Sequence, residues 1–378
     1  MRLKPFNVKH YLNYIIIGVL TAALGGYTMF GGRLDNSMLF LLEKVAISII
    51  LAVSLSLVVG FLGELSLGHA GFMCVGAYLG GKISSLLVPM LGNGPLAFVI
   101  SLLAGSAAAA VCGIIIGLPA LRLRGDYLAI VTLAFGEIVK SLFMNSSDAT
   151  FGGSLGLETP RYDKKVLFIF AFILVLVTLA AIQNLMRSKH GRAITAIRDN
   201  EIAARATGIN VTKYKLLAFT LSAAFAGVAG VLYSYSNYRV QSLNFSYNYS
   251  IDILVMVVLG GMGNINGAII AAALITFLDT KLATILTGDL AVLQNLFYAL
   301  ILIVIVIYNN APALKAIREK YSLGVLFDKF RKKNDPSVVN DDKAKWDVIT
   351  TKINMDEVLS VDLKGQDLTQ PYDEGGVK

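Results

Sequence analysis

The sequence predicts an all-α, polytopic helical membrane protein. Of its 378 residues, 56% are hydrophobic and only 15% are charged, whereas soluble domains carry about 25% charged residues. Apolar runs of about 18 residues or more recur between residues 11 and 308, and each can cross a hydrocarbon layer about 30 Å thick. Because a backbone in lipid must satisfy its own hydrogen bonds, each run is predicted to be helical. We expect about 8–10 membrane segments, some of them short and broken.

Charge and composition argue against several other functions. The net charge is +8, but the excess lies in loops and at the chain ends, as the positive-inside rule describes, so it does not indicate nucleic-acid binding. Cys74 and Cys112 lie in apolar segments, and together with three histidines they offer no metal-ligand spacing. Residues 152–156 match the G-x-S-x-G pattern, but a polar loop precedes them where a hydrolase needs a strand. No phosphate-binding loop motif is present, so we expect no enzymatic activity, cofactor or metal in this chain.

Uninterrupted apolar runs predict most of the spans. A basic lead precedes the first run, which is longer than the core of a signal peptide, so we predict a retained first span and a cytoplasmic N-terminus. The polar, glycine-rich loop 145–165 is predicted to lie outside the cell. The predicted spans cover about 11–30, 39–60, 95–118, 127–144, 166–185 and 216–236.

The glycine-rich segment 63–82 holds Glu64, Ser66 and His69 at or near membrane depth. Its glycines allow two interpretations, because small residues let helices pack closely and glycine also permits a broken segment that lines a cavity. Ionisable groups within a membrane are costly and usually face a cavity or a partner. This polar cluster and Glu137, in the span at 127–144, are therefore candidates for a translocation route.

The longest polar interval, residues 187–215, lies between two apolar regions and is predicted to be cytoplasmic. Its first part, GRAITAIR, predicts a short helix with Ile194 and Ile197 on one face. Its second part predicts a helix at 199–208, with acid at the N-terminus and Gly208 as the left-handed residue that ends it. Such a small, smooth helix fits a protein cleft better than a lipid surface. The alternative is an interfacial amphipathic helix without a partner.

The region after residue 236 predicts an interrupted pair of segments. Glycines around Gly263 break the apolar stretch 251–287 in the middle. If the polar loop and the basic region after the last span are both cytoplasmic, an odd number of crossings must follow the span at 216–236. We therefore predict that 251–287 crosses twice, as a short piece before Gly263 and a longer one after it, ahead of a last span at about 290–308.

Composition divides the chain into two parts. Residues 1–330 contain all the predicted spans and are predicted to form the membrane domain. Residues 331–378 mix charges of both signs with few apolar residues, which predicts a cytoplasmic tail that is partly disordered.

Several motifs together resemble those of a known family. Glu201, Ala203, Ala204 and Gly208 resemble the EAA-type loop of ABC-importer permeases. Between about residues 45 and 308, further motifs in order resemble the LivM-like permease subunit of branched-chain amino acid importers. These motifs are GELSLGHAGF, RLRGDYLAIVTLAFGEIV, FGGSLGL, GRAITAIRDNEIAARATGIN and VMVVLGGMGNINGA. The family often ends its last span with proline-glycine-leucine, whereas this chain reads NNAPALKAI, and the tail after residue 330 lies outside the pattern.

The resemblance implies a membrane permease that imports branched-chain amino acids with the help of other subunits. In this family two related permeases pair in the lipid, two cytoplasmic ATPases bind their coupling helices, and an external binding protein delivers the substrate. On this basis the ATPase-coupling residues are Arg198, Asp199, Glu201, Ala203, Ala204 and Gly208, and the translocation residues are Glu64, Ser66, His69 and Glu137.

Two alternatives remain open at this point. The resemblance does not fix the substrate, so one alternative is an ABC permease of the same kind for urea or short amides. The other is an ion-coupled secondary transporter or channel, which would explain intramembrane Glu137 and His69 but not a structured cytoplasmic loop.

Overall fold

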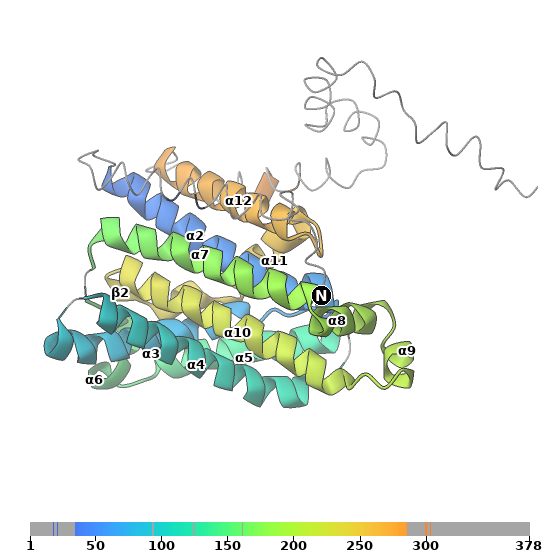
Figure 1. Ribbon diagram of the computed structural model, residues 1–378. Coiled ribbons are helices and arrows are strands. Elements are labelled where there is room, and N and C mark those ends of the chain that lie inside the picture. Colours follow the sequence, from blue (N-terminus) through green and yellow to red (C-terminus); the bar gives the residue numbers. More distant parts are fainter. Residues whose placement is uncertain are drawn as a thin grey trace, which may run out of the picture. The chain divides into compact units, whose positions relative to one another are not determined.

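The computed structural model describes residues 35–285 apart from 93, 124 and 161, together with the single residues 18, 21, 299, 300 and 303. Apart from those single residues, the predicted spans at 11–30 and 290–308 and the tail 331–378 lie outside the described residues. Within the described part of the chain, seven helices are long and apolar enough to cross a membrane, and almost all regular structure there is helical (Figure 1). The predicted all-α class is confirmed.

The long helices follow one another with short connections, and each predicted span within the described part falls inside one of them. The long helices are α2 (Asn36–Ser56, continued by the π-helical turn η2, Leu57–Leu62), α3 (His69–Leu91), α4 (Pro95–Ala120), α5 (Asp126–Met144), α7 (Lys164–Arg187), α10 (Val211–Ser236) and α12 (Ile265–Ile285). The shorter helices are α6 (Asp148–Phe151), α8 (Lys189–Asp199), α9 (Glu201–Ala206) and α11 (Tyr247–Gly260), with 3₁₀ turns η3 (Gly153–Leu155) and η4 (Ser242–Phe245) and strands β1 (Leu157–Glu158) and β2 (Arg239–Val240).

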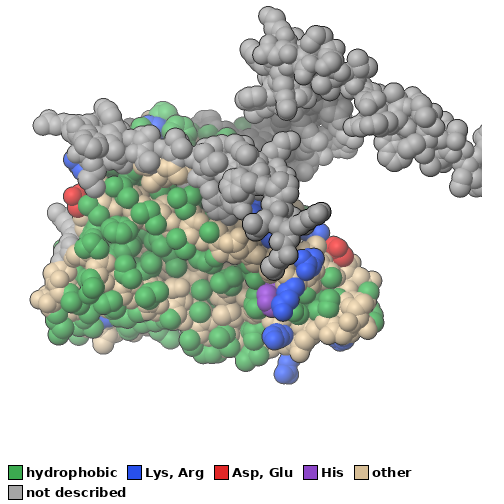
Figure 2. Space-filling view, in the orientation of Figure 1, with side chains coloured by type: hydrophobic (Ala, Val, Ile, Leu, Met, Phe, Trp, Pro, Cys, Tyr) green, Lys and Arg blue, Asp and Glu red, His purple; other side chains and the backbone are tan. Residues whose placement is uncertain are grey.

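The surface matches a lipid environment. Figure 2 shows hydrophobic side chains spread over the described helices on one face, with Lys and Arg gathered near α8. Large apolar side chains are exposed along α4 and α5, including Leu103, Ile115 and Ile138, each more than 60% exposed. Such a continuous apolar surface is unstable in water and stable in a bilayer.

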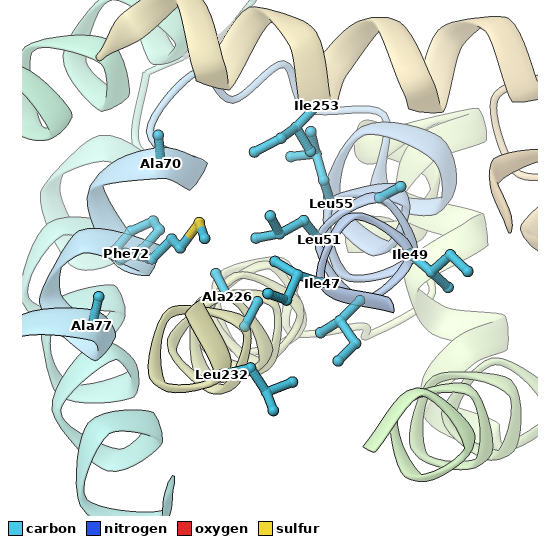
Figure 3. Packing of buried hydrophobic residues seen from close by; sticks show 14 of the residues in the cluster. Ile47, Ile49, Leu51, Leu55, Ala70, Phe72, Ala77, Ala226, Leu232 and Ile253 are labelled. Carbon is cyan, nitrogen blue, oxygen red and sulfur yellow. The ribbon is translucent and has the colours of Figure 1, made fainter. Parts of the chain in front are cut away.

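Helix α2 forms the centre of the packing. In the most apolar 18-residue stretch of α2 and η2, 94% of the sequence is buried within the protein. Helix α2 packs against α7, α10, α11 and α12. Figure 3 shows Leu51 and Leu55 pointing toward Phe72 of α3, whereas Ile49 points away to the other side of α2. A helix that is apolar all round is expected to be enclosed on every side, and α2 fits that rule.

Helices α3, α4 and α10 cross at glycines. A Cβ atom at Gly76 of α3 would lie 2.4 Å from the carbonyl oxygen of Gly227 in α10, and one at Gly230 would lie 2.1 Å from the carbonyl oxygen of Met73. Gly105 brings α4 equally close, because a Cβ there would lie 2.4 Å from Val231. Small residues thus allow direct backbone contact between these helices, which confirms the packing interpretation of the α3 glycines at this crossing.

The segment between η2 and α3 is broken. Residues 63–68 have no regular structure, and Gly63 begins them in the left-handed region at φ 79°. The Nε2 atom of His69, the first residue of α3, lies 2.8 Å from Ser54 Oγ. Ser54 lies about two helical turns before the end of η2, so the chain folds back along α2 before α3 begins. The predicted break is therefore present at 63–68, whereas 69–82 belongs to the regular helix α3, and a role of this segment in lining a route stays a prediction.

Helices α11 and α12 form an antiparallel hairpin on either side of Gly263, as predicted. Gly261 and Gly263 have φ values of 92° and 81°, which shape the turn. A Cβ at Gly260 would lie 2.5 Å from the amide nitrogen of Ala268, so the two helices touch next to the turn. Helix α11 has 14 residues and is about 21 Å long, shorter than a hydrocarbon layer of about 30 Å. Two crossings in this region stay a prediction.

The described helices run between two ends of the protein (Figure 1). We call the end that carries α8 and α9 the loop end, and the end that carries β1 and β2 the strand end. At the loop end, Gly60 of η2 lies against both α8 and the α11–α12 turn, because its carbonyl oxygen is 3.1 Å from Arg198 Nη1 and a Cβ on it would be 2.6 Å from the nitrogen of Gly263. At the strand end, β1 pairs with β2 in antiparallel register, with Leu157 opposite Val240. The loop at 145–165 and the loop after residue 236 therefore share one end of the protein.

Candidate functional site

Helices α8 and α9 form a folded unit at the loop end. The hydroxyl of Ser188 caps α8 by accepting the His190 N–H at 3.1 Å. Ile194 and Ile197 are buried on one face of α8, as the sequence predicts. They join Leu57 and Leu62 of η2 in an apolar cluster that also holds Ala204 of α9 and Val211 of α10. The loop is thus anchored against the membrane helices.

The second short helix begins two residues later than predicted and ends earlier. Asp199 is the last residue of α8, and Asn200 then adopts an extended backbone with φ −159°. The Asn200 side chain accepts the Ala203 N–H at 3.0 Å and so caps α9, which spans Glu201–Ala206 instead of 199–208. Competition between a continuous helix and this side-chain cap explains the difference. Gly208 has φ 86° just after the helix, which confirms its predicted left-handed conformation.

Helix α9 presents a small outward surface. Ala204 is buried against the loop-end cluster, whereas Ile202 is 74% exposed. Ala203, Ala206 and Gly208 are also exposed. The outward side of α9 therefore presents one apolar side chain among small residues, together with Arg205, whose side chain is 65% exposed.

Lys215 joins three elements in one ion-pair cluster. Its Nζ contacts Glu64 Oε1 and lies 3.1 Å from Glu201 Oε2. The Lys215 side chain is only 4% exposed, and those of Glu64 and Glu201 are 12% and 22% exposed. Arg205 Nη2 lies 2.9 Å from the other Glu201 oxygen. A single buried ammonium thus ties α9 to α10 and to the broken segment before α3.

Sequence reasoning missed Lys215. The lysine occupies the same face of α10 as Val211, Ala218 and Ser222, all of which are buried. A charged residue on an otherwise buried helical stripe is a signal that a partner of opposite charge lies nearby.

Arg198 provides a second link from the loop to the membrane helices. Its Nη1 donates to the carbonyl oxygen of Gly60 at 3.1 Å, and its Nε and Nη2 contact Asp199 Oδ1 at 3.3 and 3.2 Å. A Cβ at Gly63 would lie 2.7 Å from Arg198 Cγ, and one at Gly263 would lie 3.5 Å from Arg198 Nη1. Arg198 therefore lies between η2 and the α11–α12 turn, and a shift of α8 would press on both.

The four predicted route residues fall into separate clusters. Glu64 belongs to the Lys215 cluster at the loop end. Ser66 and His69 are each 2% exposed, and His69 contacts Ser54. Glu137 lies on α5, where it pairs with Lys140.

The N-termini of α3 and α11 are each held by a side chain from another helix. The Ala70 N–H at the start of α3 donates to Ser250 Oγ of α11 at 3.1 Å. The Tyr247 N–H at the start of α11 donates to Glu137 Oε1 at 3.0 Å. Each of these two helix starts is thus capped by a side chain from another helix, and α3, α5 and α11 converge at this place.

Comparisons with known proteins agree with this arrangement. Residues 37–308 match the family described as branched-chain amino acid transport system / permease component. The high-affinity branched-chain amino acid transport system permease protein LivM of Salmonella typhimurium is 40% identical over 265 residues, which cover 61% of this chain and 60% of that protein. The ribose import permease protein RbsC of Escherichia coli (strain K12) is 28% identical over 299 residues, which cover 73% of this chain and 86% of that protein.

The probable branched-chain amino acid transport permease protein LivH of Methanocaldococcus jannaschii is 30% identical over 152 residues, which cover 40% of this chain and 44% of that protein. The chain spans about three fifths of the length of the LivM proteins of Salmonella typhimurium and Escherichia coli. No solved structure matches this chain. Because the family match covers most of the sequence and the described part holds several apolar membrane-length helices, the chain is a multi-pass membrane protein that belongs to the family of branched-chain amino acid transport system permease components.

Proposed function

We propose that this chain is the permease subunit of an ATP-binding-cassette importer for branched-chain amino acids. The observation that carries the proposal is the folded α8–α9 unit, which Lys215 and Arg198 fasten to the broken segment 63–68 and to η2. A partner that moved this unit would move the membrane helices with it. Two ATPase subunits on the cytoplasmic side are the proposed partners, and α9 is the proposed coupling helix.

The proposed transmission follows two contacts. ATP-driven closure of the ATPases displaces α9, and the Lys215 cluster carries the displacement to Glu64 at the start of the broken segment. Arg198 carries it to Gly60 and the α11–α12 turn. The first contact leads into the segment that holds Ser66 and precedes His69, so movement of the loop alters their surroundings. The second leads to η2 and to the turn between the end of α11 and the start of α12.

The proposed translocation route lies between two permeases. On α5, Tyr127, Ile130, Ile138 and Leu142 form an exposed stripe, each at least 61% exposed, and Glu137 lies next to it. A second permease packed on this stripe would place Glu137 and the α3 and α11 N-termini beside a shared passage. The LivM and LivH proteins of Methanocaldococcus jannaschii, at 27% and 30% identity, support two related permeases as the assembly. An extracytoplasmic binding protein would deliver the substrate.

Branched-chain amino acids are favoured over other substrates by sequence similarity. Identity to the LivM proteins of Salmonella typhimurium and Escherichia coli is 40%, compared with 28% to the ribose permease of Escherichia coli. Uptake of ribose, urea or a short amide instead of leucine by the assembled transporter would replace the proposed substrate and leave the proposed coupling intact.

The coupling role is tested at Ile202. With its partner subunits in proteoliposomes, Ile202→Asp is expected to lower ATP-driven leucine uptake at least tenfold, because it places a charge in the centre of the proposed ATPase contact. Ile202→Val keeps the apolar contact and serves as the matched control. Unchanged uptake and unchanged leucine-stimulated ATP hydrolysis in Ile202→Asp would contradict the proposal. Uptake that follows a proton gradient without ATP would instead support an ion-coupled transporter.

A further inference from the structure

A separate cavity of about 450 Å³ lies toward the strand end, enclosed by α2, α10, η4, α11 and α12. Its size falls within the usual range for small-molecule sites. The residues that line it include neither the Lys215 cluster nor Glu137.

Three charged side chains from three helices line the cavity. Lys44 comes from α2, Asp252 from α11 and Asp279 from α12. The hairpin geometry relates the positions of the residues on α11 and α12. Gly260 of α11 contacts Ala268 of α12 next to the turn. Asp252 lies eight residues before Gly260 and Thr276 lies eight residues after Ala268, so these two residues are at the same level of the antiparallel hairpin. Asp279 lies about one turn farther toward the strand end. One ammonium group from α2 and two carboxylates from the hairpin thus line the same cavity.

Thr276 supplies an independent sign that the cavity takes a polar ligand. Its side chain lines the cavity, and the residue is only 6% exposed. Its Oγ1 atom is buried and has no hydrogen-bond partner. A buried hydroxyl without a partner is unfavourable, and a ligand that donates or accepts a hydrogen bond at this height would remove the penalty.

The remaining wall is apolar. Ile47, Phe245, Met256 and Ile275 line the cavity, and each is at most 5% exposed. Aliphatic and aromatic side chains next to a set of opposite charges match a ligand that has a charged head and a short aliphatic body. An α-amino acid with a branched side chain has this shape: its carboxylate complements Lys44, and its ammonium complements Asp252 and Asp279.

We propose that this cavity is a binding site for an aliphatic α-amino acid within a single permease chain. The site rests on the proposed function in that it names the same substrate class. It adds a location inside the chain, separate from the passage between two permeases. A zwitterion held there would occupy the strand-end half of the protein, between its release from a binding protein and its entry into the shared route.

The test uses the full-length chain alone in lipid nanodiscs, with tritiated L-leucine as the probe in a scintillation proximity assay. Leucine is expected to bind, and 4-methylpentanoate and 3-methylbutylamine, which lack the ammonium and the carboxylate respectively, are expected to compete at least tenfold more weakly. The double substitution Asp252→Asn with Asp279→Asn is expected to weaken leucine binding at least tenfold, and Met256→Trp is expected to abolish it by filling the cavity. Asp35→Asn changes an exposed acid at the start of α2 and serves as the matched control.

Thermal melting of every variant identifies those that fail to fold. Thr276→Val replaces one hydroxyl by a methyl group, so it serves as a second cavity variant with little risk to folding. Wild-type binding in all the cavity variants, or no leucine binding to the wild-type chain, would overturn the inference. If the assembled transporter still imports leucine in that case, the proposed function stands and only the internal site is lost. If neither the chain nor the assembly handles leucine, the proposed substrate fails as well.

Discussion

Replacing Lys215 with methionine tests how firmly the α8–α9 unit is held. Methionine has a similar length but no charge, so the substitution leaves Glu64 and Glu201 facing each other at 12% and 22% exposure. Removing one partner of a buried ion pair costs about 3–5 kcal/mol of stability. Because the two carboxylates are partly exposed, we expect a cost of about 3 kcal/mol here. Because every 1.4 kcal/mol is a factor of ten, opening of the α8–α9 unit should become roughly 100-fold more frequent.

Hydrogen exchange followed by mass spectrometry measures this opening in the purified chain without any partner. Amides of α8 and α9 are expected to exchange roughly 100-fold faster in Lys215→Met, whereas amides in the middle of α2 keep their protection. Lys213→Met is the matched control, because Lys213 lies two residues before Lys215 on the opposite side of the same helix and is exposed. Adding Glu64→Gln to Lys215→Met removes one of the two facing charges and should restore part of the protection. In the assembled transporter, Lys215→Met is expected to hydrolyse ATP with reduced leucine uptake.

Equal exchange rates in Lys215→Met and the wild-type chain would refute the reasoning, because they would show that the buried ammonium does not hold α9 in place. Equal effects of Lys213→Met and Lys215→Met would also refute it, because the exposed lysine has neither carboxylate as a partner.

Three further predictions follow from the geometry. Asn200→Ala removes the acceptor for the Ala203 N–H and should destabilise α9 by about 1 kcal/mol, which faster amide exchange at Ala203 would show and an unchanged rate would contradict. Gly227→Val should destabilise the protein by about 3 kcal/mol, because a Cβ there would lie 2.9 Å from the carbonyl oxygen of Gly105. Thermal melting measures this loss against the control Gly94→Val, since a Cβ at Gly94 would meet no atom within 4 Å. Equal melting temperatures of the two variants would count against the glycine contact. Glu137→Gln keeps an acceptor for the Tyr247 N–H but loses the charge that pairs with Lys140, so leucine uptake should fall about tenfold at unchanged stability; full uptake would remove Glu137 from the proposed route.

The described spans could be predicted from the sequence because length and hydropathy alone decide them. The break at 63–68 and the turn at Gly263 could also be predicted, because glycine leaves a local signature. The Lys215 cluster could not be predicted in the same way. Glu64 and Lys215 are 151 residues apart along the chain, and a pattern read over one helix reports only neighbours on that helix.

The boundary of α9 shows a different limit. The acidic run Asp199-Asn200-Glu201 suits a helix start at any of its three positions, and propensity alone does not choose among them. Asn200 is the residue that caps α9, because its side chain accepts the Ala203 N–H. Helix α8 extends to Asp199 because Ile194 and Ile197 are packed against the membrane helices. Tertiary contact thus fixes what local preference leaves open.

The broken segment before α3 also constrains the order in which the chain is assembled during synthesis. The N–H of Leu67 is satisfied by Thr132, 65 residues later, and the N–H of Ala70 by Ser250, 180 residues later. Until the ribosome has made those residues, two amide donors of the third span lack the hydroxyls that hold them in the finished protein. The start of α3 and the segment before it therefore reach their final hydrogen bonding only after α5 and α11 have been made.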